Sequence, residues 1–547
     1  MIIQRRPCTA RPVGEVTHWW YVGGIGLEWK GGKEKMHNKA VAETNGGRIE
    51  GDYQDGLYVF KGIPYAAPPV NELRWLPPQP VPPWEGVRQA REFGPIAPQN
   101  PLLESGIEAL TIEGPQDEDC LYLNLWTPGL DSGRRPVMVW IHGGAFIIGA
   151  GSQPVYKGHS LATRGNTVIV TLNYRLGAFG FMNLKEITAG KIPATGNEGL
   201  LDQVAALQWV RDNISSFGGD PDNITVFGES AGGMSIGCLM AMPAAQGFFQ
   251  KAVLESGAAN TVGALEEAVD ITRQYLEILG TSPHDTDSLR SLSVKRILSA
   301  QQELGDKIRE ATHRITPFQP LVDGDVMPEL PIDAIQKGSA RDIKVIVGTN
   351  LEEMRLFGVM DPGLINLDEE GMVNRLKDLI PAEYVAGLIK TYREARKNRG
   401  DTAGPSELLM AIQTDMMFRM PAVRLVEAQC DHGQPAYHYL FMWKSPVMGG
   451  ILGACHALEI GFVFGEHDDT FCGSGAEADA LSRCIQESWL AFARMGDPAC
   501  EEIGSWPPYC DKRATMILDK ECRIEEAPYD EERGAWDDFK MAFTKPI

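Results

Sequence analysis

Short apolar runs alternate along the chain with longer segments in which apolar residues recur at helical spacing. The runs are rich in β-branched residues, as buried parallel strands are, and three of them cover residues 137–141, 167–172 and 223–227. After Asp202, apolar residues recur every three or four positions as far as Phe217, and Gly218 and Gly219 then end the pattern. Strands that alternate with such helices predict an α/β fold with a doubly wound, mostly parallel sheet and helices on both faces.

The length of 547 residues would allow three or four domains, but no linker, repeat or low-complexity block divides the chain. We expect a single catalytic domain over residues 37–547, in which the part around 265–440 supplies helical insertions that cover the site. Residues 1–36 differ, with six basic and three acidic residues and several tryptophans among glycines. They lack the apolar core of a signal peptide. We predict an extension with little structure, with Met36 as the true start.

The formal net charge is −22, from 51 basic and 73 acidic residues. A strongly acidic surface argues against nucleic acid and anionic membranes as partners, but it leaves an uncharged small molecule unaffected. No apolar run approaches the length of a membrane span.

The segment 227–233 contains the pattern G-x-S-x-G, centred on Ser230. In this pattern a serine lies on a sharp turn between a strand and a helix, with its hydroxyl exposed. The run 223–227 supplies the strand, and residues 231–240 can begin a buried helix. An ordinary glycine-rich turn is the alternative interpretation.

A second segment favours catalysis. The apolar run 137–141 leads directly into His142, Gly143, Gly144, Ala145 and Phe146. An H-G-G-x loop after a strand is typical of enzymes that stabilise the negative oxygen of a tetrahedral intermediate with backbone N–H groups. Both motifs occur in the chain order that such enzymes require.

Together with further blocks, these motifs resemble the type-B carboxylesterases, an α/β-hydrolase family that also holds the cholinesterases and the bacterial p-nitrobenzyl esterases. The further blocks lie at 60–66, 73–75, 84–86, 118–124, 202–210, 217–221, 492–498 and 506–509. The similarity spans about residues 41–540. It implies the α/β-hydrolase fold and hydrolysis of carboxylic esters through an acyl-enzyme on Ser230, with no cofactor.

The general base must follow the serine in the chain, since α/β-hydrolases order their triad as serine, acid, histidine. Four of the ten histidines precede Ser230, namely His18, His37, His142 and His159. His284 and His313 lie in a polar region without a motif, and His438 lies in a strand-like run. His456, in the segment 453–460, resembles the histidine loop of the family and is the expected base.

The expected acid follows the apolar run 345–347, which ends in Gly-Thr-Asn and meets the adjacent Glu352 and Glu353. The resemblance places the triad acid at Glu353, with Glu352 as the alternative. Met354 stands where the family usually has glycine, so the turn there can differ. An ordinary charged helix start would also fit the two carboxylates.

The resemblance also implies an oxyanion hole. Its donors would be the backbone N–H groups of Gly144, Ala145 and Ala231, with Gly143 providing the turn that lets them converge. Glu229, beside the nucleophile, and Ser256 match family positions. They are expected to support the site by hydrogen bonding, or to be purely structural.

The ten cysteines form no C-x-x-C pair and no zinc pattern. Secreted members of the family usually pair the cysteine at the position of Cys120 with an upstream cysteine, and here Ala97 stands in that upstream region. We therefore expect reduced cysteines and a cytoplasmic protein of bacterial type. The sequons at Asn213 and Asn223 would then carry no glycan.

The substrate is predicted only as a class. Residues 97–119 contain no tryptophan, whereas the family's choline-binding tryptophan lies in that loop, so acetylcholine is not expected. Aryl or short-chain acyl esters, carbamates and xenobiotic esters fit equally. Two alternatives are hydrolysis of a related acyl bond, such as an amide or thioester, and a non-catalytic binding protein with the same fold.

Overall fold

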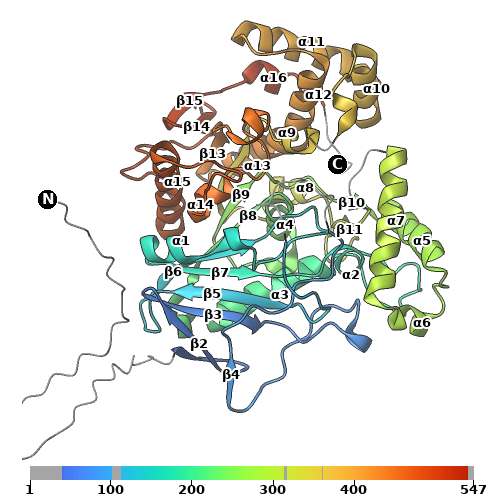
Figure 1. Cartoon of the computed structure of the whole chain (residues 1–547), viewed down its shortest axis with the longest axis vertical. Coiled ribbons are helices and arrows are strands. Elements are labelled where there is room, and N and C mark those ends of the chain that lie inside the picture. The colour runs from blue at the N-terminus through green and yellow to red at the C-terminus, as the bar shows by residue number, and fades with distance from the viewer. Residues whose placement is uncertain (1–39, 102–111, 313–316, 360, 540–547) are drawn as a thin grey trace, which may run out of the picture. The chain divides into compact units, whose positions relative to one another are not determined.

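The computed structural model describes residues 40–101, 112–312, 317–359 and 361–539, and a sheet of thirteen strands runs through them (Figure 1). The strands of this sheet are β1 (Ala40–Thr44), β2 (Gly47–Gln54), β3 (Leu57–Pro64), β4 (Val87–Gln89), β5 (Tyr122–Thr127), β6 (Arg135–Ile141), β7 (Val168–Leu172), β8 (Gly219–Glu229), β9 (Lys251–Glu255), β12 (Lys344–Asn350), β13 (Ala436–Phe441), β14 (Ala514–Leu518) and β15 (Arg523–Glu526). A separate pair joins β10 (Gly263–Ala264) to β11 (Leu321–Val322). The predicted extension over residues 1–36 lies outside the described residues.

The centre of the sheet is parallel and its flanks are antiparallel, except that the short β4 pairs parallel with β2. The parallel strands follow the order β7-β6-β8-β9-β12-β13-β14, whereas β1, β2, β3 and β5 on one side and β15 on the other pair antiparallel. In β6, Val139 and Ile141 pack into the core cluster on one face, while Met138 and Trp140 pack into that on the other. A strand buried on both faces reads as a continuous apolar run. The predicted α/β fold is confirmed.

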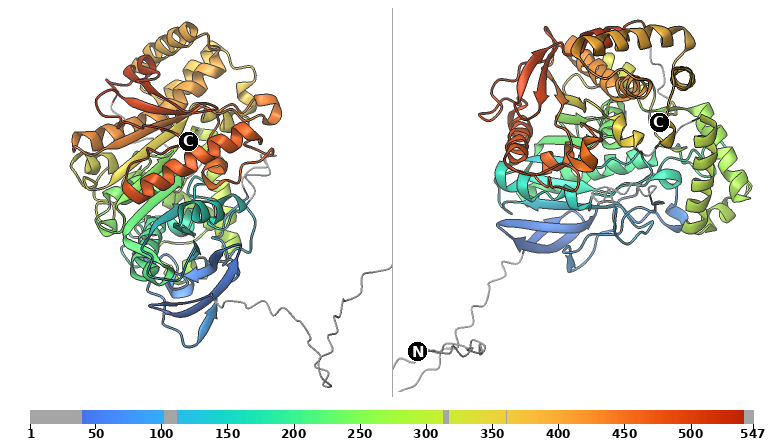
Figure 2. Two further views of the ribbon diagram at one scale, coloured as in Figure 1. Left: turned by 90° about the vertical axis from the view of Figure 1, so that its left-hand side faces the viewer. Right: turned by 45° about the horizontal axis from the view of Figure 1, so that its top comes forward.

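Helices cover both faces of the sheet and extend beyond it (Figure 2). The helices are α1 (His159–Gly165), α2 (Gly177–Gly180), α3 (Glu198–Asn213), α4 (Ala231–Ala241), α5 (Leu265–Leu279), α6 (Thr286–Ser291), α7 (Val294–Thr312), α8 (Pro331–Gln336), α9 (Met354–Gly358), α10 (Glu369–Leu379), α11 (Ala382–Arg399), α12 (Pro405–Thr414), α13 (Met420–Asp431), α14 (Ile460–Phe464), α15 (Ala476–Met495) and α16 (Asp530–Gly534). The helix predicted after Asp202 is α3, which begins earlier than the apolar pattern. A 3₁₀ turn over Ile214–Phe217 extends it to Gly218, whose φ of 72° ends the segment.

The helical insertion predicted around residues 265–440 is divided into two pieces. The first contains α5, α6 and α7, and the second contains α9 to α12; in Figure 1 they lie apart, at the right and at the top. The strand β12 separates them in sequence because its apolar residues occupy the middle of the sheet between β9 and β13. The parallel centre thus continues through the region that was expected to be insertion.

One disulfide contradicts the expectation of reduced cysteines. It joins Cys430, near the end of α13, to Cys510, 80 residues later, with 5.4 Å between the Cα atoms. Such spacing carries no sequence signature, and only the fold brings the two residues together. Among the described residues, none of the helices is long and apolar enough to cross a membrane.

Candidate active site

Ser230 is the single residue between β8 and α4. Its φ of 54° and ψ of −124° place it in a conformation that L-residues rarely adopt, as a sharp strand-to-helix turn requires. The turn packs tightly on β6: a Cβ atom at Gly228 would lie 2.6 Å from the Ile141 carbonyl oxygen, and one at Gly232 would collide with the same oxygen. The two glycines of the motif are therefore needed for close approach of the backbone.

His456 and Glu353 are brought together from loops that follow β13 and β12. The imidazole Nδ1 lies 2.7 Å from Glu353 Oε2, and the Asn350 backbone N–H donates to Glu353 Oε1 at 2.7 Å. The Glu353 side chain is fully buried, and that of His456 is almost so. A carboxylate held in this way can fix the imidazole orientation and stabilise its protonated form.

The alternative acid, Glu352, has other partners. Its carboxylate pairs with the Arg355 guanidinium at 2.7 Å and accepts the backbone N–H of Ala454 at 3.1 Å. Met354, where a glycine was expected from the family, begins α9 and lies on a cavity wall. Of the two adjacent glutamates, Glu353 is thus the one that contacts the imidazole.

Two aromatic rings pack against the His456 imidazole. Phe357, in α9, lies 5.2 Å away between ring centroids, and Phe418 lies 4.9 Å away. Phe418 belongs to a π-helical turn over Asp415–Arg419 between α12 and α13. Sequence analysis missed both residues because a buried phenylalanine in an apolar helix carries no local sign of what it touches.

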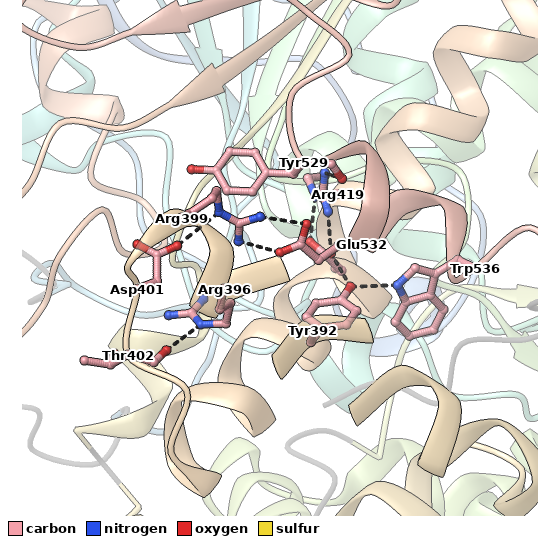
Figure 3. A network of polar contacts seen from close by, with 10 residues as sticks. Tyr392, Arg396, Arg399, Asp401, Thr402, Arg419, Tyr529, Glu532 and Trp536 are labelled. Carbon is pink, nitrogen blue, oxygen red and sulfur yellow. Dashed lines mark hydrogen bonds and ion pairs between the residues drawn. The ribbon is translucent and has the colours of Figure 1, made fainter. Parts of the chain in front are cut away.

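A buried polar network holds this π-helical turn (Figure 3). Within the turn, Arg419 Nε donates to Asp415 Oδ1 at 2.6 Å. Tyr392 of α11 donates its hydroxyl to the same carboxylate and accepts the indole N–H of Trp536 at 2.7 Å. The network thus joins the turn that carries Phe418 to two distant segments of the chain. π-helical turns are frequent at functional sites.

Three buried carboxylates control the charge of His456. The imidazole Nε2 lies 3.1 Å from Glu229 Oε1, next to the serine in sequence. Burial lowers the pKa of the imidazole, but Glu229, the hydrogen-bonded Glu353 and the nearby Glu459 outweigh it and raise the pKa of His456 to about 9. Burial also raises the pKa of Glu229 itself well above its usual range. The site therefore favours the imidazolium strongly.

Behind these groups lie Glu255 and Glu459, whose roles the sequence did not indicate. Trp489 Nε1 donates to Glu255 Oε1 at 2.7 Å, and Ser256 Oγ donates to Glu459 Oε1 at 3.1 Å. Burial raises the pKa of Glu255 to about 8 and that of Glu459 to about 7. Ser256 is therefore linked to the site through Glu459, which lies three residues after His456.

The expected oxyanion loop follows β6 and has an unusual backbone. Gly144, Ala145 and Phe146 all have positive φ, at 109°, 52° and 62°. A Cβ atom at Gly143 would lie 2.8 Å from the Glu229 carbonyl oxygen, so the loop packs directly on the serine turn. Within the described part of the chain, the backbone N–H groups of Gly144, Ala145 and Ala231 donate to no protein acceptor. Gly144 and Ala145 lie on the wall of the cavity described below, whereas Ala231 is buried beneath the serine turn.

His142, at the start of this loop, has a structural position. Its ring is fully buried, stacks on Tyr174 with 4.5 Å between centroids, and contacts the Gly143 carbonyl oxygen at 2.8 Å. Burial lowers the pKa of His142 to about 4, so the ring is neutral at physiological pH.

A cavity of about 900 Å³ opens above the serine. Ser230, His456, Gly144 and Ala145 lie on its wall, together with Glu229. The two helical insertions supply much of the rest: α7 contributes Gln301, Gln302, Gly305 and Arg309, and the second insertion contributes Met354, Leu356, Phe357, Leu364, Leu379 and Met410. The candidate site residues thus lie beyond the carboxyl ends of parallel strands, where ligand sites are usual in α/β proteins, under a largely apolar pocket.

Comparison with known proteins identifies the family of this chain. The sequence profile of the carboxylesterase family matches residues 38–536. The para-nitrobenzyl esterase of Bacillus subtilis is 41% identical over 502 residues, covering 90% of this chain and 97% of the relative. The phenmedipham hydrolase of Pseudarthrobacter oxydans is 34% identical, covering 89% and 96%.

Solved structures of similar proteins point to the same family. A carboxylesterase of Geobacillus stearothermophilus superposes with a TM-score of 0.82 at 38% identity, covering 91% of this chain and all of that one. A solved p-nitrobenzyl esterase gives a TM-score of 0.79 at 40% identity, covering 90% and 99%. The chain belongs to the carboxylesterase family and is a carboxylic ester hydrolase.

Proposed function

We propose that the chain hydrolyses uncharged carboxylic esters through an acyl-enzyme on Ser230, with His456 as general base and Glu353 as the triad acid. The observation that carries this proposal is the 2.7 Å contact between His456 Nδ1 and Glu353 Oε2 on the same cavity wall as the serine turn. The binding-protein alternative has no need of such an arrangement.

In the first step, neutral His456 would take the Ser230 proton as the oxygen attacks the ester carbonyl carbon. The carbonyl oxygen would become an oxyanion that accepts hydrogen bonds from the free N–H groups of Gly144, Ala145 and Ala231. The imidazolium then gives its proton to the departing alcohol, which leaves the acyl group on Ser230.

In the second step, water would replace the alcohol. His456 takes a proton from the water as its oxygen attacks the acyl carbon, and returns that proton to Ser230 as the carboxylic acid leaves. Both steps need the imidazole to be neutral before attack, which links rate to the charge of the carboxylates around it.

The substrate class follows from the cavity. Its wall joins methionine, leucine and phenylalanine side chains to a smaller set of charged residues, namely Lys157, Glu229, Arg309, Asp361, Arg375, Asp378, Glu466 and Asp468. The volume of about 900 Å³ accommodates a drug-sized molecule. Together with the relative named para-nitrobenzyl esterase, this supports esters with an aromatic or medium-length apolar part.

A covalent probe tests the nucleophile directly. We expect a fluorophosphonate to inactivate the enzyme with one phosphonyl group on the peptide that contains Ser230, as found by mass spectrometry, because only an activated serine displaces fluoride. Thr470→Val is a matched control, since Thr470 is another hydroxyl on the cavity wall, and this variant should label normally. Labelling at any other residue would refute the assignment.

The pH dependence tests the role of Glu229. Because neutral His456 is the base and its pKa is raised to about 9, kcat/KM should fall as pH decreases below that value. Glu229→Gln removes the carboxyl group that stabilises the imidazolium, so the pKa of His456 should fall and the acid limb should move to lower pH by roughly one to three units. Steady-state hydrolysis of p-nitrophenyl esters from pH 5 to 10 measures this.

Glu466→Gln is the control for that experiment. Glu466 also lies on the cavity wall, but its carboxylate pairs with Lys157 at 3.4 Å. The same chemical change there should leave the acid limb in place. An equal shift in both variants would mean that the shift reflects cavity charge in general.

A further inference from the structure

The peptide unit that joins Glu353 to Met354 is held at both of its polar atoms. Glu353 directly precedes α9, Met354 begins it, and both residues are buried. The His456 backbone N–H donates to the Glu353 carbonyl oxygen at 3.3 Å. The Met354 backbone N–H donates to the Thr414 hydroxyl oxygen at 3.2 Å. Because the Glu353 side chain starts from this peptide, these two contacts help to set where its carboxylate lies.

The Thr414 hydroxyl supplies an acceptor that α9 does not supply itself. The first N–H groups of a helix have no partner within it, and the side chain of the preceding residue often accepts one of them. Here that residue is Glu353, whose carboxylate does not cap α9 and instead contacts Asn350 and His456. The acceptor therefore comes from 60 residues later in the chain. Without it, the Met354 N–H would have no acceptor among the described residues.

The same short segment also contacts the base. Thr414 is the last residue of α12, is buried, and directly precedes the π-helical turn over Asp415–Arg419. Phe418 of that turn packs its ring against the His456 imidazole. The buried polar network described above anchors the turn to α11 and to the segment around α16 (Figure 3). Thr414 is thus held firmly enough to fix what it contacts.

We propose that Thr414 is a positioning residue of the triad, whose hydroxyl fixes the Glu353–Met354 peptide and so keeps the Glu353 carboxylate on His456 Nδ1. The inference rests on the proposed function, because it gives Thr414 a task only if Glu353 is the triad acid. Among the described residues, the cavity wall includes Gln413 but not Thr414. Thr414 therefore acts through Glu353 and not through the substrate.

Thr414→Val tests this role, because valine has nearly the same shape but no oxygen to accept the Met354 N–H. A displaced Glu353 would orient the imidazole less well, so kcat for p-nitrophenyl esters should fall by roughly ten- to a hundredfold. KM should stay about the same, since the cavity wall is unchanged. Thr414→Ser restores the acceptor and should keep kcat within about threefold of wild type. Steady-state kinetics of the full-length enzyme measure these values.

The pH profile separates positioning from a loss of folded enzyme. Three buried carboxylates face the His456 imidazole and raise its pKa, namely those of Glu229, Glu353 and Glu459. In Thr414→Val the contact with Glu353 should be looser, so the pKa of His456 should fall. The acid limb of kcat/KM should then move to lower pH by roughly half a unit or more. A smaller folded fraction would instead lower the rate equally at every pH.

Thr272→Val is the matched control. Thr272 is also a buried helical threonine, but it lies in α5, where its hydroxyl donates to the Ala268 carbonyl oxygen at 2.8 Å. Among the described residues, none of α5 lies on the cavity wall. The same chemical change there should leave kcat and the acid limb unchanged.

Fluorophosphonate labelling of Ser230 distinguishes the two possible failures. If wild type labels at Ser230 but Thr414→Val keeps the wild-type kcat and acid limb, the role of Thr414 is refuted and the proposed function stands. If wild type does not label, the proposed function itself fails. Should Thr414→Val not fold, Thr414→Ala removes the hydroxyl without adding a methyl group. An unchanged acid limb in that variant would equally refute the role of Thr414.

Discussion

Replacing Ser230 with alanine is expected to lower kcat for p-nitrophenyl esters by roughly 10⁶-fold, because the acyl-enzyme can no longer form. KM should change little, since the cavity that holds the substrate remains. Residual turnover above the uncatalysed rate is expected from the oxyanion loop and binding alone. Steady-state rates on esters from C2 to C12 measure the loss, and the wild-type optimum reports the size of the acyl pocket.

Ser256 offers a closely matched control for this substitution. It directly follows β9 as Ser230 follows β8, and its φ of 48° is also positive. Ser256→Ala should therefore carry a similar backbone cost, but its hydroxyl donates to Glu459, behind the site, so kcat should fall by far less. Thermal unfolding of both variants checks the fold. A loss of only tenfold in Ser230→Ala would place the nucleophile elsewhere.

The second large effect is expected from Glu353→Gln, which should lower kcat by roughly 10³- to 10⁴-fold. The amide is nearly isosteric, but it cannot stabilise the imidazolium, and its N–H₂ group can hold the ring in the wrong tautomer. The lost negative charge should also lower the pKa of His456, so the acid limb of the rate profile should move to lower pH. A purely structural role would leave that limb unchanged.

Glu352→Gln provides the comparison at the adjacent position. Its partner Arg355 is partly exposed, and exposed ion pairs contribute little to stability. This variant should keep kcat within tenfold of wild type. If the two variants ranked in the opposite order, Glu352 would be the acid and the contact between His456 and Glu353 would be incidental.

Much of the arrangement could be predicted from the sequence because it is encoded locally. Ser230 directly follows β8, and Gly143 and Glu353 lie within a few residues of the ends of β6 and β12. An apolar run fixes the strand, and the residues after it must then emerge at the carboxyl edge of a parallel sheet. The motifs and their positions after strands therefore both predict a site at the carboxyl edge of the sheet, without knowledge of the rest of the fold.

The remainder depends on contacts between segments far apart in the chain. Phe418 reaches His456 only because a π-helical turn rotates it toward the imidazole, and Cys430 meets Cys510 only through the packing of α13. Apolar periodicity shows which face of a helix is buried, but it does not show which residue it will touch. The run 345–347 is apolar, but such a short run does not show whether it joins the central sheet, so the division of the helical insertion by β12 was not predicted.

Because β12 divides the helical insertion in two, enzymes with this fold can diversify in two separate regions. The proposed reacting groups follow the ends of sheet strands, whereas α7 on one side and α9, α10 and α12 on the other supply much of the cavity wall from two independent stretches of sequence. Natural variation or directed evolution can therefore exchange one wall at a time, and selectivity for the two halves of an ester can drift separately. The catalytic residues are thus kept as one set, whereas substrate preference is determined by two separate segments of the chain.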